Sequence, residues 1–305
     1  MSILTNNFIS DFFLIVIRWI YSIVNDYSIA IILLTLVLKL AMLPLDIKQR
    51  KSSLKMAAIK PELDTIKKKY GSDPQLMNKR QQELYRSSGV KPLAGCLPAI
   101  LSMFILFPFF GALRVLATEQ TIALLLNAVN SGATSIHLPQ WLWVHNLWQP
   151  DSGFSAIIPS STEFLSFIKT NSTYISPQTL SMLQQGGLIS FDSAQGILVN
   201  ADTYGTLTSG ILSSNGVEGL KNGWFILPVL AGVTMYFSQS MSMKNNAQMQ
   251  QQGKMMLYVF PVISVLICAS SNTAFSLYWT ASNVFMLTQY LIIGVIAKAR
   301  AVNKV

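Results

Sequence analysis

The chain has 305 residues, of which 51% are hydrophobic and only 11% are charged. A soluble domain carries about 25% charged residues, so this composition excludes an ordinary soluble globular protein. No charged residue occurs between Met255 and Ala297, a run of 43 residues. About 20 apolar residues cross a hydrocarbon core, so the run is long enough for two crossings and predicts an integral membrane protein.

The net charge of +9 is unevenly distributed along the chain. Residues 48–91 contain 12 basic and four acidic residues, a net charge of +8, whereas residues 118–222 contain two lysines and six acids, a net charge of −4. Because basic loops stay on the cytoplasmic side, the first segment is predicted inside and the second outside. The N-terminus is then outside and the C-terminus, with Lys298, Arg300 and Lys304, is in the cytoplasm.

Residues 1–27 are predicted to form an N-terminal interfacial amphipathic helix. Four apolar residues recur at helical spacing in Phe8–Val24, namely Phe12, Ile15, Trp19 and Ile23. The stretch is short and contains Asp11 and Arg18, so a helix lying in the membrane interface fits better than a spanning one. The N-terminus also lacks the features of a cleaved signal peptide.

Five transmembrane helices are predicted, and the fold class is therefore an all-α polytopic membrane protein. The first occupies residues 28–47 and the second residues 92–117, and residues 224–297 hold the third to fifth. The last two are separated by the polar cluster Ser270-Ser271-Asn272, which is typical of a turn. Residues 298–305 form a short basic cytoplasmic tail.

Residues 48–91 are predicted to form a basic cytoplasmic helical hairpin. Apolar side chains in its first arm are spaced by three and four residues, which is typical of a helical seam: Met56, Ile59, Leu63, Ile66 and Tyr70. Asp73 is a good N-cap and Pro74 suits a first helical position, so a second arm is predicted over Gln75–Ser87. Pro61 should bend or interrupt the first arm.

Residues 118–223 are predicted to form an extracytoplasmic insertion of partial order. The segment is rich in Ser, Thr, Asn, Gly and Gln, with short helices expected near Thr121–Val129 and Pro177–Gln185. No function follows from its sequence. Its histidines, His137 and His145, are expected to be structural.

Lys39 is the most informative single residue. It precedes Lys48 by nine residues, which places it ~13 Å from the inner edge at ~1.5 Å per residue, near the middle of a ~30 Å core. A cation at this depth costs about 2.5–3.5 kcal/mol unless it finds water or a partner. One interpretation is a lysine that snorkels to the interface. The other is a cation facing a wet cavity, with Thr35 one turn earlier on the same face.

Other spans also carry polar residues at depth. They are Ser102 in the second span, Gln239 in the third, and Ser282, Asn283 and Gln289 in the last. Such side chains need partners on other helices or a polar cavity, which favours a shared hydrophilic interior. Tyr278 and Trp279, near the outer boundary, are alternatively typical of an aromatic belt.

Taken in order, several stretches resemble the YidC/Oxa/Alb family of membrane protein insertases. They are Leu33–Leu45 with the basic hairpin after it, Val90–Pro98, Trp143–Leu147, Ile226–Pro228 with Gly232–Met235, and Leu277–Trp279 with Ser282-Asn283. Each motif alone is weak, whereas five in family order are strong. The insertion over Asp151–Asn222 departs from the short loop usual in the family.

The resemblance implies an insertase and chaperone that inserts and helps fold nascent membrane proteins, not an enzyme, in the bacterial plasma membrane. It implies a hydrophilic groove open to the cytoplasm and to lipid, with Lys39 as the groove cation where an arginine is usual. Tyr278 and Trp279 then match the family's client contacts, and Ser102 its polar position in the second span. The expected partners are nascent clients and membrane lipids, with the ribosome and Sec translocon as candidates at the basic hairpin; no DNA, cofactor, metal or catalytic residue is expected.

Three alternatives stay open. A chaperone that assembles membrane complexes without inserting proteins would share every feature of the sequence. A small-solute transporter is less favoured, because a single cation without an intramembrane acid is a poor relay for protons or ions. An intramembrane enzyme would need a nucleophile with a base, or metal ligands, at depth, and the spans show neither.

Overall fold

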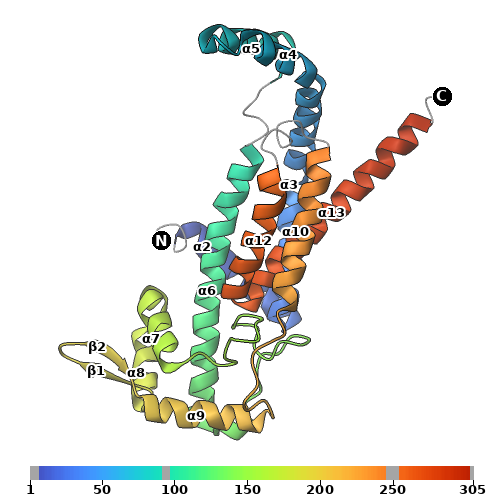
Figure 1. Cartoon of the computed structure of the whole chain (residues 1–305). Helices are drawn as coiled ribbons and strands as arrows, with labels where there is room; N and C mark the ends of the chain where they lie inside the picture. Colours follow the sequence, from blue (N-terminus) through green and yellow to red (C-terminus); the bar gives the residue numbers. More distant parts are fainter. Residues whose placement is uncertain (1–6, 91–96, 245–253, 303–305) are drawn as a thin grey trace. The chain divides into compact units, whose positions relative to one another are not determined.

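The computed structural model describes residues 7–90, 97–244 and 254–302 (Figure 1). Helices dominate, and the described residues add one two-stranded antiparallel sheet. The mostly helical architecture agrees with the predicted all-α class. The chain divides into two compact units: Met1–Ile32, Phe107–Leu230 and Val265–Trp279 form unit 1, and Leu33–Leu106, Ala231–Ser264 and Thr280–Val305 form unit 2.

Eight helices correspond to the predicted interfacial helix, hairpin and spans. They are α2 (Phe8–Val24), α3 (Tyr27–Ala58), α4 (Lys60–Tyr70), α5 (Pro74–Ser87), α6 (Leu97–Ser131), α10 (Ile226–Lys244), α12 (Lys254–Ser270) and α13 (Thr273–Val302). Pro44, Pro108 and Pro261 lie inside α3, α6 and α12 without ending them.

Within the described residues, two helices are long and apolar enough to cross a membrane. They are Tyr27–Ala58 and the Phe104–Ser131 part of α6, and Leu257–Ser270 is a shorter apolar helix. The number of five spans therefore stays a prediction.

Helix α2 has the predicted bounds and two apolar faces. Asn7 caps its start by accepting hydrogen bonds from the backbone N–H groups of Ile9 and Ser10 at 3.0 and 3.2 Å. Its protein-facing side is buried, through Phe13, Leu14, Ile17 and Ile20. The opposite side is exposed and holds the apolar series noted in the sequence, Phe12, Ile15, Trp19 and Ile23, together with Phe8. An exposed row of this kind suits contact with lipid.

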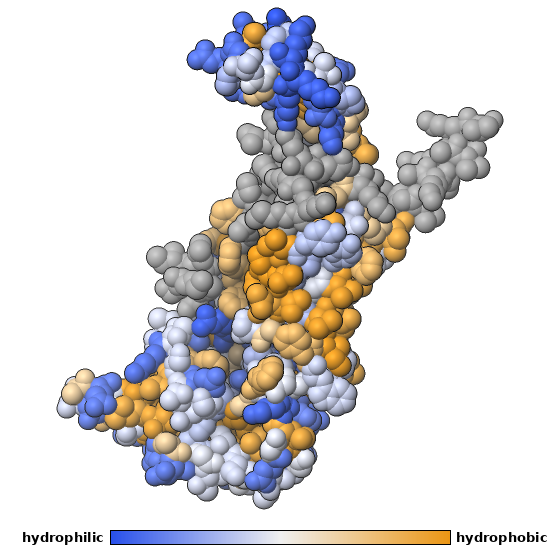
Figure 2. Space-filling view, in the orientation of Figure 1, coloured by the Kyte–Doolittle hydropathy of each residue, from blue (hydrophilic) through white to orange (hydrophobic). Residues whose placement is uncertain are grey.

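Helices α4 and α5 form where the sequence predicts the two arms. Helix α3 ends at Ala58 and α4 begins at Lys60, with Pro61 in its first turn, so the proline marks an interruption. Asp73 caps α5 by accepting from the N–H groups of Gln75 and Leu76 at 3.1 and 3.0 Å. A small apolar cluster supports them: Met56, Ile59 and Val90 with Leu63, Leu84 and Tyr85. The surface over these helices is strongly hydrophilic (Figure 2).

Helix α6 extends beyond the predicted outer boundary of the second span. The sequence predicts that the span ends near Ala117 and that a separate helix covers Thr121–Val129; instead, α6 continues without a break to Ser131. No Gly or Pro interrupts this stretch, and the hydroxyls of Thr118 and Thr121 donate to the carbonyls of Arg114 and Ala117 at 3.1 and 2.7 Å. The same helix therefore leaves the apolar region and enters the insertion.

The C-terminal end of α6 supplies part of the core of the insertion. The insertion contains η2 (Ala133–Ser135), α7 (Ser161–Thr170), η3 (Ser172–Tyr174), α8 (Pro177–Gln185), β1 (Ile189–Asp192), β2 (Gly196–Val199) and α9 (Ala201–Ser214). Its buried core includes Leu125 of α6, Phe164 and Ile168 of α7, Leu183 of α8 and Ile211 of α9. Helix α8 has the predicted bounds, whereas the β1–β2 hairpin and this common core exceed the partial order predicted.

The two ends of the insertion are joined by a buried polar neck. Asn222 accepts from the N–H of Asn146 at 2.7 Å and donates through Nδ2 to the carbonyls of Asn146 and Pro150 at 2.9 and 3.0 Å. The carboxylate of Asp151 accepts from Trp143 Nε1 and from the N–H groups of Phe225 and Leu227 at 3.0, 3.1 and 2.7 Å. The chain thus leaves and re-enters the helical core at one point, and Asp151 satisfies N–H groups at the start of α10.

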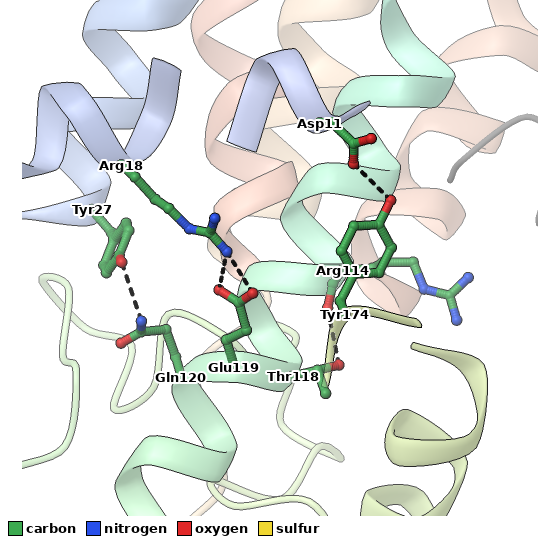
Figure 3. A network of polar contacts seen from close by, with 8 residues as sticks. All are labelled: Asp11, Arg18, Tyr27, Arg114, Thr118, Glu119, Gln120 and Tyr174. Atoms are coloured by element: carbon green, nitrogen blue, oxygen red, sulfur yellow. Dashed lines mark hydrogen bonds and ion pairs between the residues drawn. The ribbon is translucent and has the colours of Figure 1, made fainter. Parts of the chain in front are cut away.

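Polar contacts also tie α2 to the outer part of unit 1 (Figure 3). Arg18 Nη2 contacts both carboxylate oxygens of Glu119, at 2.5 and 2.7 Å. The hydroxyl of Tyr174 donates to Asp11 at 2.9 Å, and Gln120 Nε2 donates to the hydroxyl of Tyr27 at 3.1 Å. The first two contacts fix α2 against α6 and the η3 turn, and the third fixes the start of α3 against α6.

Replacing Asp151 should destabilise the neck strongly. In Asp151→Ala three donors lose their acceptor in a buried setting, which costs on the order of 2–4 kcal/mol. Differential scanning fluorimetry of the purified protein should show a lower unfolding midpoint. Gly223→Ala should act similarly, because a Cβ there would lie 2.1 Å from Asp151 Oδ1. The exposed Asp64→Ala is the matched control; equal midpoints for Asp64→Ala and Asp151→Ala would contradict this role.

Tyr174 should titrate well above an ordinary tyrosine. Partial burial, followed by the hydrogen bond to Asp11, raises the pKa of Tyr174 from 10.0 to about 12. Because the folded-state pKa is the higher one, its stabilising contribution is present below pH 10 and is lost as the pH rises towards 12. The tyrosinate absorbance that Tyr174→Phe removes should follow this pKa. Asp11→Asn should lower it and Asp192→Asn should leave it unchanged; no response to Asp11→Asn would refute the coupling.

Candidate functional site

Lys39 lies on α3, half-buried, in unit 2. Among the described residues it forms no ion pair within 4.0 Å, and the acid that acts on its charge is Asp46, seven residues further along the same helix. One turn before Lys39, Thr35 is fully buried. The cation therefore lies in a largely apolar helical setting without a directly bonded carboxylate, as its position in the sequence predicts.

The polar residues of α10, α12 and α13 in unit 2 differ in how they are satisfied. Asn283 is buried and donates to the carbonyl of Ala231 at 3.3 Å, which links α13 to α10. The hydroxyls of Ser282 and Ser264 are buried and have no hydrogen-bond partner among the described residues. Gln239 is half-buried on α10. An unpaired hydroxyl in an apolar interior costs about 1–3 kcal/mol, so these positions suit transient contact with a polar group.

Tyr278 and Trp279 fall in unit 1, at the start of α13. Tyr278 is buried in a cluster of rings, with centroids 4.4 Å from Phe109 and 6.1 Å from Phe275. The ring of Trp279 lies 5.5 Å from Phe275, and its Nε1 is buried with no partner among the described side chains. Tyr278 thus packs as a core residue, whereas Trp279 keeps a free donor.

Unit 2 brings together six of the eight predicted site residues: Thr35, Lys39, Ser102, Gln239, Ser282 and Asn283. Ser102 lies in α6, but its side chain falls outside the described part of the chain, as does Cys96. Two further buried hydroxyls, those of Ser264 and Thr280, have no partner in the part described and were not among the predicted site residues. Ser264 could have been predicted, because it is the one polar residue in the apolar run Val262–Ile267.

The chemistry available in unit 2 is that of binding. The ammonium of Lys39 and several neutral hydrogen-bonding groups lie on helices that also expose apolar side chains, among them Val37, Leu40, Phe237 and Val262. Hydrophobic residues gather over the visible face of these helices in Figure 2. In the residues described, no group of three or more His, Cys, Asp or Glu could hold a metal ion. Such a surface can hold a segment that is mainly apolar with a polar or acidic flank.

Apolar helices long enough to cross a membrane, a basic helical pair and the cation Lys39 within an apolar stretch are the features of a helical membrane protein. Residues 19–300 match the family described as 60Kd inner membrane protein, and the chain belongs to that family. The resemblance to the YidC/Oxa/Alb insertases is thereby confirmed.

Relatives carry the same description of function in their names. The chain is 28% identical over 273 residues to membrane protein insertase MisCA of Bacillus subtilis, covering 88% of this chain and 70% of that protein. It is 28% identical over 271 residues to membrane protein insertase YidC of Fusobacterium nucleatum, covering 88% and 87%. It is 32% identical over 170 residues to membrane protein insertase YidC of Clostridium tetani, covering 54% and 69%.

Two neighbouring residues on α13 should respond oppositely to truncation. Ser282→Ala removes an unpaired hydroxyl and should leave the unfolding midpoint unchanged or raise it. Asn283→Ala removes the bond to the carbonyl of Ala231, which the hydroxyl of Thr234 also contacts at 3.2 Å; the loss of this bond between helices, about 0.5–1.5 kcal/mol, should lower the midpoint. Thermal unfolding in detergent measures both. An equal loss of stability in the two variants would mean that Ser282 is bonded within the folded protein.

Proposed function

We propose that the protein is a membrane protein insertase and chaperone of the bacterial plasma membrane, with nascent membrane proteins as its clients. The family match over residues 19–300 carries this proposal, and the relatives named as insertases are bacterial. The lone cation Lys39 and the unpaired hydroxyls in the same compact unit support it, because they supply a polar path bounded by apolar helices. The family inserts proteins and is not a class of enzyme in the usual sense.

In the proposed mechanism a client segment binds along the helices of unit 2. Its polar flank lies beside Lys39, which replaces part of the hydration that the flank loses on leaving water. Its apolar part lies against the exposed aliphatic and aromatic side chains and passes into lipid. Gln239, Ser282 and Asn283 offer hydrogen bonds along this path. Attraction between the cation and an acidic flank would favour movement of that flank without nucleotide hydrolysis.

The proposed topology has five spans, the N-terminus outside and the C-terminus in the cytoplasm. The charge distribution supports it, because α4 and α5 belong to the segment that carries +8 whereas residues 118–222 carry −4. The exposed apolar row of α2 supports an interfacial position for that helix. On this topology the hydrophilic surface of α4 and α5 faces the cytoplasm, where it is available to clients, the ribosome or the Sec translocon.

Insertion should depend on the charge of Lys39. In proteoliposomes, protease-protected insertion of a short single-span client with an acidic flank should fall at least about tenfold in Lys39→Ala, equivalent to about 1.4 kcal/mol of lost attraction. Lys39→Arg should retain most of the activity, because it preserves the charge. The exposed Lys169→Ala of α7 is the matched control and should behave as the parent.

The other outcomes separate the alternatives. Full insertion by Lys39→Ala would leave the insertase assignment in place and make Lys39 a snorkelling residue. No insertion by the parent, with assembly of an already inserted complex retained, would identify an assembly chaperone. Flux of small solutes in the same vesicles would identify a transporter.

A further inference from the structure

A polar pocket at the outer end of unit 1 takes no part in the proposed insertion path. It has a volume of about 800 Å³ and lies between the outer part of α6, the Trp148–Pro150 segment, α7 and the Ala269–Asn272 turn. All of its lining residues belong to unit 1. Sites for small ligands in proteins typically span about 300–1,000 Å³, so the space suits a headgroup or a short chain segment. We refer to it as the outer pocket.

Arg114 of α6 is the cation of the outer pocket. Its guanidinium lies 5.8 Å from the ring of Phe110, and within the described residues it forms no ion pair. Figure 3 shows this guanidinium pointing away from Glu119, which is occupied by Arg18. Glu163 also lines the pocket, but its Oε2 already accepts from the N–H and hydroxyl of Ser160, at 2.8 and 3.0 Å. The arginine is therefore available to an external anion.

Two buried donors on the pocket wall also lack partners. Gln149 is 6% exposed and Trp148 is 2% exposed, and neither Gln149 Nε2 nor Trp148 Nε1 has a hydrogen-bond partner among the described residues. The backbone of Gln149 is fixed, because its carbonyl accepts from the N–H and hydroxyl of Thr273 at 2.9 and 2.7 Å. Buried donors are nearly always bonded, so these two indicate an absent acceptor. The guanidinium of Arg114, together with the N–H donors of Gln149 and Trp148, matches the several oxygens of a phosphate.

Aromatic rings line part of the outer pocket, beside serine, threonine and asparagine side chains, and they favour a lipid over a free ion. Phe110, Phe154 and Phe167 line it, and Phe154 is 90% exposed. Arg114 lies three residues before Ala117, the predicted outer end of the second span, which is the level of lipid headgroups on the proposed topology. Inorganic phosphate would leave the aromatic wall unused, whereas a phospholipid would place its phosphate at Arg114 and an acyl chain against the rings.

We propose that the outer pocket binds the headgroup of an anionic phospholipid of the outer leaflet, with Arg114, Gln149 and Trp148 bonding its phosphate. The proposal rests on the proposed topology for the leaflet, but it does not require that the protein inserts clients. An acidic client tail is the competing occupant, and the measurements below distinguish the two.

The test compares lipid binding to the delipidated full-length protein by native mass spectrometry in detergent. Phosphatidylglycerol should bind the parent at least about tenfold more tightly than phosphatidylcholine of the same chain length. Arg114→Gln should remove that preference, and Arg114→Lys should retain part of it. Arg80→Gln, a change at an exposed arginine of α5, should leave the preference unchanged, as should Lys39→Ala. Unfolding midpoints identify any variant that fails to fold, and the comparison of lipids on the parent requires no variant.

Each other result overturns the proposal. Equal binding of the two lipids by the parent, or a preference that survives in folded Arg114→Gln, would exclude a headgroup site at Arg114. Displacement of phosphatidylglycerol by millimolar inorganic phosphate would show a simple anion site, and displacement by an acidic peptide alone would show a site for client tails. If only the lipid site is wrong, the parent should still insert clients but show no preference for phosphatidylglycerol. If only the insertase assignment is wrong, the parent should not insert clients but should keep the lipid preference.

Discussion

The absence of water from the hydrocarbon core governs which polar groups this chain can hold there. Backbone groups in that region must bond within their own segment, and long helices meet this requirement even where Pro44, Pro108 and Pro261 interrupt single bonds. A polar side chain in the same region needs a separate explanation. Lys39, Ser264 and Ser282 are such side chains, since neither an ion pair nor a bonded acceptor within the described residues accounts for them.

The second organising element is the continuity of α6 from the apolar region into the insertion. The helix carries Phe109 in one ring cluster, Glu119 in the ion pair with α2, and Leu125 in the core of the insertion. A rigid helix transmits position over its whole length at ~1.5 Å per residue. The insertion is therefore built as an extension of a span, and the outer pocket uses residues from both parts.

Local signals in the sequence were sufficient for many helix ends. Asp73 is an N-cap whose side chain makes the bonds expected of it, and Ser270-Ser271-Asn272 separates two apolar runs at the observed turn. Lys39 was identifiable because a charge inside an apolar run is costly regardless of its neighbours. These features depend only on residues close together in the chain.

The remaining features depend on contacts between distant residues. The neck joins Asn146 to Asn222, 76 positions apart, and no sequence feature near either asparagine predicts this pairing. The continuation of α6 beyond Ala117 was missed because apolarity falls there while helix-forming residues continue, and hydropathy reports the membrane boundary rather than the helix boundary. Tyr278 could be placed near an interface, yet its burial against Phe109 required the tertiary structure.

The polar neck has a consequence for how this chain can vary. Its two strands of backbone meet at hydrogen-bonding distance, with the N–H of His145 3.2 Å from the carbonyl of Asn222. The segment between Asp151 and Asn222 begins and ends at the neck, and hydrogen bonds hold both ends beside the start of α10. A change in the length of this segment therefore need not alter the spacing of the spans. Insertions and deletions are tolerated at such positions because closing the loop requires no further rearrangement of the core. The neck is consequently a natural graft point, where a reporter domain or a module from a relative could replace the native excursion while the membrane helices keep their own geometry.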